Sequence, residues 1–591
     1  MRAILLLVFL ADCWPMAAQF SGLSTTTDGS QLYFSSTLRL RGSAEQDAPK
    51  IFQHGTNFEL FREVIRDNSG RGFGESNYYM LIEPEVSGDG KVVVYTSTPE
   101  CYGTPTDNCL SPYMANISAA GSAKNIVPAG NPLTGYGRLS PDGRYLTTCC
   151  LPSAAFPQYA IVDLNTGQTF PGFPLVGDAF QAFADGGMLL TAGQTYSSVT
   201  IVHAAAGWVS GTSIAMSTEQ VVQAQLSRDG STILYEGLNS GGTSFELVTH
   251  NIASGAETLL DTVPLANPFD LSYNFSSWIS DNGKLALYLR PLQPNGPLEV
   301  FAENTDGTAR RIVANLMEGF NAITLSGDGA TAYAATPSAR LLRIDVGTGA
   351  TSQLNGPVPL IADLQPCAQD VSCVLGGDAV APGSVAWLDG SAFPATGEPV
   401  AVLVNGIKAP IFLGTDSYVR LQIPWETPVN QRISFVVESG DPQPFESAKT
   451  ANSASIVPNM VLAVYPQGSA ESGFLALYHQ NFSSLVSDLQ PAADGEILHL
   501  YMLGLGPVSP AVPTGERAPA GGSLSRIVNP MTCVAGGSQN VPIEFAGLAP
   551  GLTGIYQVDL KAPAGFSNDG QLICTITDSA GNVYQAQGSL P

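Results

Sequence analysis

The hydrophobic and polar positions of the chain follow a short pattern that returns several times. Each copy has an apolar residue, a small polar residue, a glycine-containing turn and a run of apolar or aromatic residues. The copies include VSGDGKVVVYTS from Val86, LSPDGRYLTT from Leu139, LSRDGSTILYEG from Leu226, ISDNGKLALYLR from Ile279 and LSGDGATAYAAT from Leu325. The pattern predicts a strand, a tight turn and a second strand.

The spacing of the copies indicates a repeat architecture. Turn aspartates mark the copies at intervals of 43 to 61 residues: Asp28, Asp89, Asp142, Asp185, Asp229, Asp281 and Asp328. A second strand, glycine turn and strand follow most markers. Two hairpins in each period are typical of a propeller blade. The sequence therefore predicts an all-β fold with a seven-bladed β-propeller at residues 19–355. Six or eight blades are the alternatives, because the Asp185 copy is degenerate and the first period carries an insertion.

The residue types in the repeat have a physical reason. A four-stranded blade cannot bury both of its faces alone, so Val93, Ile233, Leu285 and Tyr333 are expected to pack between neighbouring blades. Asp-Gly and Asn-Gly steps are expected to form two-residue hairpin turns, in which glycine supplies a positive φ. Calcium binding by the turn aspartates is the alternative, but one carboxylate per turn is fewer than calcium needs.

The repeated SPDG-like phrases resemble those of the TolB-type, WD40-like propellers of bacterial envelopes over about residues 20 to 355. The resemblance implies a propeller fold. Such propellers serve as protein-binding platforms, as carbohydrate-active enzymes or as the gating half of peptidases, so the fold leaves the function open. The chain has no G-x-S-x-G nucleophile elbow, which a peptidase partner domain of this kind would carry.

After about Asn355 the blade period stops, and short alternating strands follow with proline and glycine between them. This pattern predicts two immunoglobulin-like β-sandwich modules, at residues 356–455 and 456–591. Cys533 and Cys574 are expected to pin the two sheets of the second module together.

Five phrases of this region resemble the Solibacter-type C-terminal domain of exported acidobacterial proteins, in the same order. They lie at Ala381–Gly390, Asn405–Pro410, Leu421–Glu426, Gly504–Gly515 and Phe545–Asp559. The resemblance implies an exported or surface context and brings no catalytic residues. The family domain is usually a tail on other modules, and here the other module is a propeller.

The N-terminus has the form of a secretory signal peptide at residues 1–18. Arg2 precedes an apolar stretch, and Ala17 and Ala18 supply small residues at the expected cleavage site. Lipidation of Cys13 is the alternative, but Asp12 stands where a lipobox has a small uncharged residue. The apolar stretch is too short to span a bilayer. We expect a protein that is secreted, periplasmic or held at the cell surface, with no transmembrane segment in the mature chain.

The eight cysteines after residue 18 fall into local couples, which favours structural disulfides in an oxidising compartment. They are Cys101 and Cys109, Cys149 and Cys150, Cys367 and Cys373, and Cys533 and Cys574. Crossed pairing among the first four is an alternative, because a bond between adjacent cysteines is strained. The chain has no C-x-x-C motif and its histidines are scattered, so no metal and no cofactor is expected.

The charge of the chain excludes one class of partner. Its formal net charge is −25, with 50 acidic and 25 basic residues. A phosphate backbone would be repelled before contact, so we expect no nucleic-acid partner.

One insertion joins scarce basic residues to aromatics and is the candidate ligand rim of the propeller. Its residues are Arg62, Arg66, Arg71, Phe73, Tyr78 and Tyr79. They are expected to bind an anionic or sugar ligand, and a solvated insertion is the alternative. Trp425, Glu426, Tyr556 and Gln557 form a second candidate, for which packing is the favoured interpretation. His203 and His250 are expected to be solvent-facing or hydrogen-bonded strand residues, and no residue is assigned a catalytic role.

These observations favour an exported, non-enzymatic recognition or scaffold protein that binds envelope proteins or extracellular polysaccharide. The rival is a propeller enzyme acting on extracellular glycans, with two close carboxylates in the central funnel. A structural role in a surface layer is a third possibility.

Overall fold

The computed structural model describes most of the chain and is all-β, as the sequence predicts. The described residues are 20–36, 38–40, 50–54, 61–63, 82–97, 111–116, 123–125, 138–148, 160–170, 179–193, 197–208, 211–264, 276–291, 298–315, 319–356, 358–365, 379–394, 401–438, 445–461, 474–487, 489–536, 539–566 and 570–590. Within them, the one helical segment is a 3-10 turn, Ala204–Ala206. The chain divides into two compact units, Met1–Pro357 and Val358–Pro591.

The described strands of the first unit form seven small antiparallel sheets, each in simple sequence order. The first sheet has β1 (Phe20–Thr25), β2 (Leu32–Ser36), β4 (Lys50–His54) and β5 (Phe61–Glu63); the second has β6 (Ile82–Val86), β7 (Val92–Ser97), β8 (Ser111–Asn116) and β9 (Ala123–Asn125); the third has β10 (Tyr145–Thr148), β11 (Ala160–Asp163) and β12 (Thr169–Phe170). The fourth has β13 (Ala179–Ala184), β14 (Met188–Gly193), β15 (Ser198–His203) and β16 (Gly211–Ala215); the fifth has β17 (Gln220–Leu226), β18 (Thr232–Leu238), β19 (Ser244–Asn251) and β20 (Glu257–Pro264). The sixth has β21 (Ser277–Ile279), β22 (Leu285–Pro291), β23 (Leu298–Asn304) and β24 (Arg311–Asn315); the seventh has β25 (Ala322–Leu325), β26 (Thr331–Ala335), β27 (Leu341–Asp345) and β28 (Thr351–Gln353).

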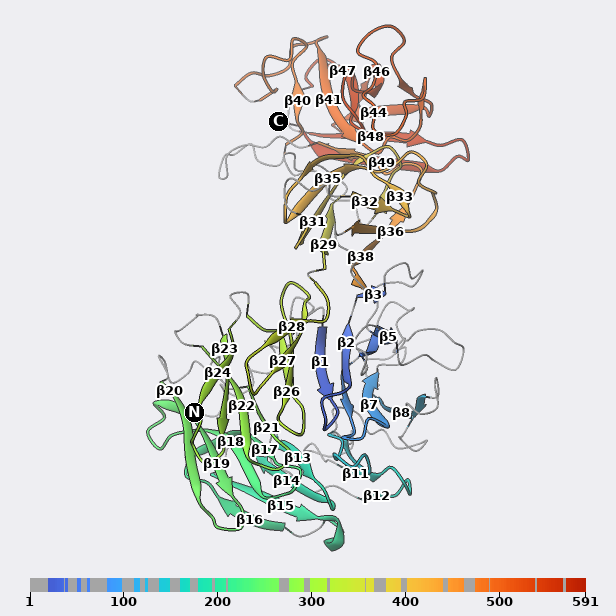
Figure 1. Cartoon of the computed structure of the whole chain (residues 1–591). Coiled ribbons are helices and arrows are strands. Elements are labelled where there is room, and N and C mark those ends of the chain that lie inside the picture. Colours follow the sequence, from blue (N-terminus) through green and yellow to red (C-terminus); the bar gives the residue numbers. More distant parts are fainter. Residues whose placement is uncertain are drawn as a thin grey trace. The chain divides into compact units, whose positions relative to one another are not determined.

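Contacts between these sheets run in a circle, although no described sheet closes on itself. The first strands of neighbouring sheets meet, β1 with β6, β13 with β17, β17 with β21 and β21 with β25. Strand β1 also contacts β25 and β26 of the seventh sheet, and Figure 1 shows blue β1 beside yellow-green β26. In the six sheets that make these contacts, the first strand therefore lies innermost, which is the arrangement of a β-propeller.

Apolar layers between neighbouring sheets hold this arrangement together. One core joins Leu190 and Val199 of the fourth sheet to Ile233 and Tyr235 of the fifth. Similar cores join the second sheet to the third, the third to the fourth, the fifth to the sixth and the sixth to the seventh. Val93, Ile233 and Tyr333 are fully buried, and Leu285 is half-buried against the core of the last two sheets. The predicted packing between neighbouring sheets is confirmed for Ile233 and Leu285, and Tyr333 donates to Gly29 O of the first sheet.

The repeated turn is longer than the predicted two-residue hairpin, so that prediction was wrong. In the fifth sheet, Leu226 pairs with Ile233 across six intervening residues. The buried hydroxyl of Ser227 donates to Asp229 Oδ1 (2.7 Å) and accepts from the backbone N–H of Thr232 (3.0 Å). Only the glycine, Gly230, has a positive φ, of 70°. The serine and aspartate close the turn with side-chain bonds that a two-residue loop has no room for.

Five other copies make the same serine or threonine bond to the acidic or amide residue. These are Thr26 to Asp28, Ser87 to Asp89, Ser140 to Asp142, Ser280 to Asn282 and Ser326 to Asp328. The carboxylates thus accept hydrogen bonds within their own turns.

Backbone hydrogen bonds link successive turns at the inner end of the sheets. They run from Thr27 N to Gly88 O, Gly88 N to Pro141 O, Asp185 N to Arg228 O, Asp229 N to Asp281 O, Asp281 N to Gly327 O and Asp328 N to Thr27 O. The last of these bonds connects the seventh sheet to the first. The second residue of each turn therefore lies at the axis of the circle.

The second unit contains two modules, each with two sheets around one core. In the first module, one sheet has β29 (Leu360–Gln365), β31 (Val385–Ser391), β35 (Tyr418–Gln422) and β34 (Ile411–Gly414). The other has β30 (Ala379–Val380), β38 (Ala448–Ser453), β36 (Gln431–Glu438), β32 (Ala401–Val404) and β33 (Ile407–Lys408). Buried side chains of both sheets share a core that includes Leu388, Val419, Val402 and Phe435.

The second module pairs a large sheet with a four-stranded one. The large sheet has β39 (Asn459–Met460), β40 (Leu477–Tyr478), β41 (Ile497–Leu503), β47 (Tyr556–Lys561), β46 (Ile543–Leu548), β43 (Arg526–Ile527) and β42 (Val508–Ser509). The smaller has β45 (Gln539–Val541), β44 (Met531–Ala535), β48 (Gln571–Thr577) and β49 (Val583–Ser589).

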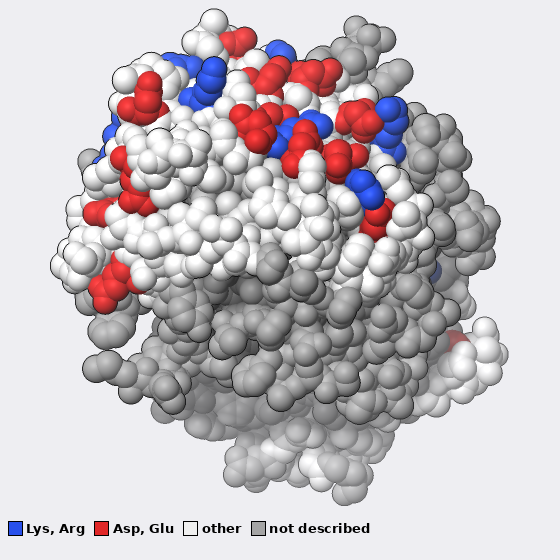
Figure 2. Space-filling model, turned by 90° about the horizontal axis from the view of Figure 1, so that it is seen from below, with Lys and Arg blue, Asp and Glu red and all other residues white. Residues whose placement is uncertain are grey.

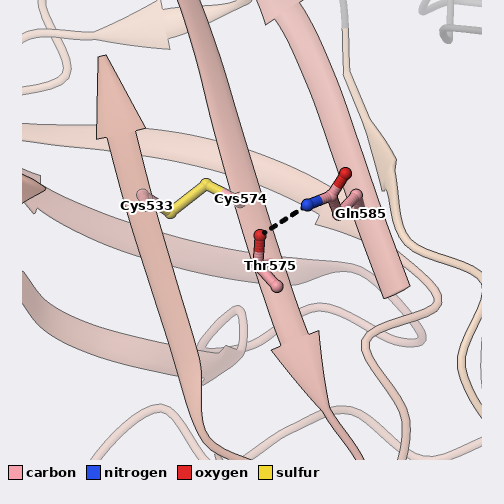
Figure 3. The surroundings of a disulfide bond; sticks show 4 residues. All are labelled: Cys533, Cys574, Thr575 and Gln585. Atoms are coloured by element: carbon pink, nitrogen blue, oxygen red, sulfur yellow. Dashed lines mark hydrogen bonds between the residues drawn. A yellow bond between two sulfur atoms is a disulfide. The ribbon is translucent and has the colours of Figure 1, made fainter. Parts of the chain in front are cut away.

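The disulfide Cys533–Cys574 is formed, but it does not pin the two sheets together. The two cysteines lie directly opposite each other on neighbouring strands β44 and β48 of one sheet (Figure 3). Both side chains point into the core of the module. The prediction of the pair was correct and the prediction of its role was wrong, because sequence separation does not tell neighbouring strands from facing sheets.

The axial glycine of the last turn gives a stability test. A Cβ at Gly327 would overlap the carboxylate of Asp281, whereas a Cβ at Gly347, in the same sheet, would meet its nearest atom, Asp345 Oδ1, at 3.4 Å. Neither glycine has a positive φ. Gly327→Ala should lower the free energy of unfolding by about 1–3 kcal/mol through overpacking. The free energy of unfolding of Gly347→Ala should stay near that of the wild type. Chemical denaturation followed by circular dichroism measures both, and equal effects would contradict the axial crowding.

The turn aspartates predict a pH dependence. A hydrogen bond from the Ser30 backbone is the main cause of the lowered pKa of Asp28. Partial burial raises the pKa of Asp89, but bonds from Lys91 and Ser87 outweigh it and leave the pKa lowered. Bonds from Ser227 and Ser231 likewise outweigh burial and lower the pKa of Asp229. Their stabilising contribution is present above about pH 4 and is lost as the pH falls through the lowered values.

Replacing the three aspartates by asparagine keeps the turn acceptor, as Asn282 does in its own turn, and removes this titration. The thermal midpoint of the triple variant should therefore fall less between pH 7 and pH 3 than that of the wild type. Glu219→Gln, at an exposed position outside the repeated turns, is the control. A triple variant with the wild-type acid profile would refute the assignment.

Candidate functional site

The most developed polar site of the described propeller residues is an axial cluster, defined as Thr27, Asp185, Arg228 and Asp281. Arg228 Nε donates to Asp185 Oδ2 (2.8 Å), and Arg228 Nη1 donates to Thr27 Oγ1 (2.7 Å). Arg228 Nη1 also lies 3.5 Å from Asp281 Oδ2, and Thr27 Oγ1 donates to the same oxygen (3.1 Å). The cluster joins the first, fourth, fifth and sixth sheets across the axis.

Two glycines make room for this cluster. A Cβ at Gly88 would overlap Arg228 Nη1 and lie 2.5 Å from Thr27 Oγ1, and a Cβ at Gly327 would overlap the carboxylate of Asp281. Glycine at these two turns therefore leaves the space that the arginine and aspartate side chains of the other turns occupy.

The charged groups of the cluster bind one another and stabilise the contacts between sheets. Burial raises the pKa of Asp281, although Thr27 and Arg228 oppose this effect. Burial lowers the pKa of Arg228, but its bonds to Asp185 and Asp281 outweigh burial and leave it raised. The guanidinium bonds two carboxylates and a hydroxyl, so the cluster connects the sheets. Neither carboxylate is free to act as a general acid or a general base.

Among the inner strands, β17 carries amide side chains that are partly exposed. Gln223 and Gln225 of β17 are half-exposed, and Gln225 Nε2 donates to Ser277 O of the next sheet. Glu85 of β6 is the acidic side chain described on these strands. Its Oε1 accepts from Arg138 Nη1 (2.5 Å) and its Oε2 accepts from the backbone N–H of Leu139 (2.6 Å). Both carboxylate oxygens therefore bind the neighbouring sheet.

A second ion-paired group lies between the fifth and sixth sheets. The buried Asp261 pairs with Arg290 (3.2 Å) and Arg310 (2.7 Å). Tyr288 donates to Glu303 (2.8 Å), and burial raises the pKa of Glu303 against this bond. These acids too are held by neighbours in the fold.

Among the described residues, no group of three or more His, Cys, Asp or Glu side chains could hold a metal ion. A shallow crevice in the second unit, lined by residues that include Val380, Ser384 and Asn459, has no room for a water molecule.

The candidate ligand rim lies almost entirely outside the described residues. Arg62 belongs to β5, of which only the backbone is described, and Arg66, Arg71, Phe73, Tyr78 and Tyr79 lie outside the described part. Residues 1–18 and the cysteines at 101, 109, 149, 150, 367 and 373 also lie outside it. These predictions stay predictions.

The second sequence candidate is a set of packing residues, as the favoured interpretation holds. Trp425 packs against the core of the second module, and Glu426 accepts from Thr514 Oγ1 (2.7 Å). Tyr556 is fully buried and donates to Gly506 O (2.5 Å), while Gln557 donates to Asp559 (2.7 Å).

Trp425 is nevertheless not the buried aromatic of its own module. Trp387 has that place, stacked on Tyr418 with its Nε1 donating to Asp389 (2.6 Å). His203 and His250 behave as predicted, since His203 is exposed and His250 Nδ1 lies 3.2 Å from Glu257 Oε1.

Sequence reasoning missed the axial cluster, although a signal was present. The second position of the repeated turn varies among Thr27, Gly88, Arg228, Asp281 and other residues, while its neighbours are nearly constant. Charged residues at that position in some copies and glycine in others indicate a crowded place where neighbouring copies meet.

The surface in Figure 2 carries acidic and basic side chains close together on its described part, with no continuous basic patch there. Among the described residues, no helix is long and apolar enough to cross a membrane.

No protein-family model matches the chain, and no curated protein matches it. Among solved structures, TolB from Acinetobacter baumannii is 18% identical with a TM-score of 0.33, and the match covers 48% of this chain and 63% of that one. The β-propeller domain of the trilobed protease from Pyrococcus furiosus is 13% identical with a TM-score of 0.40, covering 57% and 98% of the two chains.

Oligogalacturonate lyase from Vibrio parahaemolyticus is 13% identical with a TM-score of 0.38, covering 57% of this chain and 91% of that one. The neighbours thus include TolB and other β-propeller proteins. At these identities and TM-scores the likenesses carry no argument about activity.

The axial cluster predicts a stabilising role for Arg228. Arg228→Met should lower the free energy of unfolding of the first unit by about 1–3 kcal/mol, because Asp281 and Thr27 lose a charged partner at a half-buried place. Lys91→Met is the control, since Lys91 pairs with Asp89 inside one exposed turn and should cost less than about 0.5 kcal/mol. Denaturant midpoints measure the two effects. If Arg228→Met lowers the free energy of unfolding no more than Lys91→Met does, the stabilising role of the axial cluster is wrong.

Proposed function

We propose that the protein is an exported, non-enzymatic recognition or scaffold protein that binds envelope proteins or extracellular polysaccharide. In this proposal residues 19–355 form a seven-bladed propeller of the TolB type, and residues 356–455 and 456–591 form two immunoglobulin-like modules. The propeller offers a rigid face with loops for binding, and the two modules act as a stalk or docking part.

One observation carries the non-enzymatic part of the proposal. The described acidic side chains near the axis, Glu85, Asp185 and Asp281, are bonded to Arg138 or Arg228 of neighbouring sheets. Hydrolysis of a glycan needs one carboxylic acid and one free carboxylate placed on either side of a sugar ring. Carboxylates that hold sheets together are poorly suited to that chemistry, which favours recognition over turnover.

The exported location is supported by three features. Residues 1–18 have the form of a signal peptide, Cys533 and Cys574 form a disulfide, and the C-terminal half resembles the Solibacter-type domain. A disulfide in a protein of this size is typical of an oxidising compartment. The partner face in this proposal includes the rim residues Arg62 to Tyr79.

The test is binding without turnover. The purified full chain is applied to a glycan array and used as bait for envelope extracts, and bound glycans are checked for cleavage products. We expect specific capture with no product. In the double variant Arg66→Ala/Arg71→Ala, capture should weaken by about tenfold if the rim contacts the ligand, whereas Lys91→Ala should leave it unchanged. Release of shortened glycan would overturn the proposal.

A further inference from the structure

An exposed aromatic ring on the second module stacks on a histidine with one face and leaves the other side accessible to solvent. Phe482 is 49% exposed, and its ring stacks on the imidazole of His499 with centroids 3.9 Å apart and planes 5° apart. One face of the Phe482 ring is therefore covered by His499, and the ring retains a large solvent-accessible surface.

The support under this ring is rigid. His499 is buried, its Nδ1 lies 2.7 Å from Asp559 Oδ1, and its Nε2 lies 3.1 Å from Gln480 O. In the strand register, His499 of β41 stands opposite Asp559 of β47 on one side and Tyr478 of β40 on the other. Two hydrogen bonds on opposite edges of the imidazole fix its plane, and that plane sets the plane of Phe482.

The backbone at Phe482 is held in an unfavourable conformation. Its φ is +56°, in the left-handed region that bulky side chains rarely adopt. The turn is closed by a bond from Phe482 N to His479 O (2.8 Å), and His479 itself bonds Glu496 Oε1 (2.9 Å). Glycine would fit this backbone without strain. A phenylalanine held there is an outlier of the kind that marks functional sites.

Polar side chains share the turn with the ring. Gln480, Asn481 and Ser483 are exposed in the same turn, and the half-buried Tyr478 ring lies 6.5 Å from Phe482. Amides and hydroxyls beside a flat aromatic face match a sugar ring, which offers apolar C–H groups on one face and hydroxyls at its edge.

We propose that Phe482 is the stacking platform of a binding site for a neutral polysaccharide, with Gln480 and Asn481 hydrogen-bonding the sugar hydroxyls. The site rests on the polysaccharide part of the proposed function and places it on the second module. A neutral glycan is favoured over an anionic one, because the carboxylates of Asp559 and Glu496 bond His499 and His479 at this site and the chain carries a net charge of −25. A protein partner is less suited, because the platform is one ring among amides.

The test uses the full chain in affinity electrophoresis, with gels that contain galactomannan, mixed-linkage β-glucan or xyloglucan, and with polygalacturonate as the anionic counterpart. Phe482→Ala should weaken retention by the neutral glycan by at least about tenfold, as expected for loss of a principal aromatic contact. Phe482→Trp should retain binding and add a tryptophan fluorescence change on saturation.

The matched control is Phe412→Ala, since Phe412 is a comparably exposed phenylalanine (41%) on the first module. Its retention should equal that of the wild type. Thermal midpoints of all variants exclude loss of fold as the cause.

Other results would overturn the platform. If Phe482→Ala is retained like the wild type, the glycan binds elsewhere and the proposed function survives without this site. Retention by polygalacturonate alone, or by no glycan while an envelope protein is captured, would reject the neutral-glycan site but leave recognition standing. Cleavage products would reject the proposed function itself, whatever Phe482 does.

Discussion

The propeller half of this protein depends on burial of apolar faces between small sheets. A sheet of three or four strands exposes two apolar faces, and in this fold a neighbouring sheet covers each one. The last sheet must then cover the free face of the first, and the contact of β25 with β1 does so. The backbone hydrogen bond from Asp328 N to Thr27 O also joins the seventh sheet to the first.

This circular packing forces the turns toward one axis, where space is limited. Repeats of identical sequence would place the same side chain there from every sheet. The chain instead combines glycine at residues 88 and 327 with Thr27, Arg228 and Asp281, so that large and small residues fit together and opposite charges meet. The divergence of the repeats at this one position is thus a packing requirement, while the serine and aspartate that close each turn stay nearly constant.

Much of the fold followed from local pattern, and the errors came from contacts that pattern does not encode. The strand–turn–strand phrases and the packing of Val93, Ile233 and Tyr333 were predictable because each depends on a few consecutive residues. The turn type was wrong because the Ser227 hydroxyl competes for the backbone of its own loop. The axial cluster escaped because Thr27 and Arg228 are 201 residues apart, and the place of Cys533 and Cys574 within one sheet depends on strand order, which spacing does not reveal.

The two units use their polar and aromatic groups differently, and this difference favours the proposed glycan site on the second module. In the described propeller residues, acids such as Glu85, Asp261 and Asp281 are bonded across sheet junctions, so they are committed to holding the fold. In the second module, a buried histidine with both ring nitrogens bonded supports a phenylalanine that stays open to solvent. Packing alone would place glycine at a left-handed position and turn an aromatic ring inward. A group that satisfies neither preference is explained most simply by a contact outside the chain.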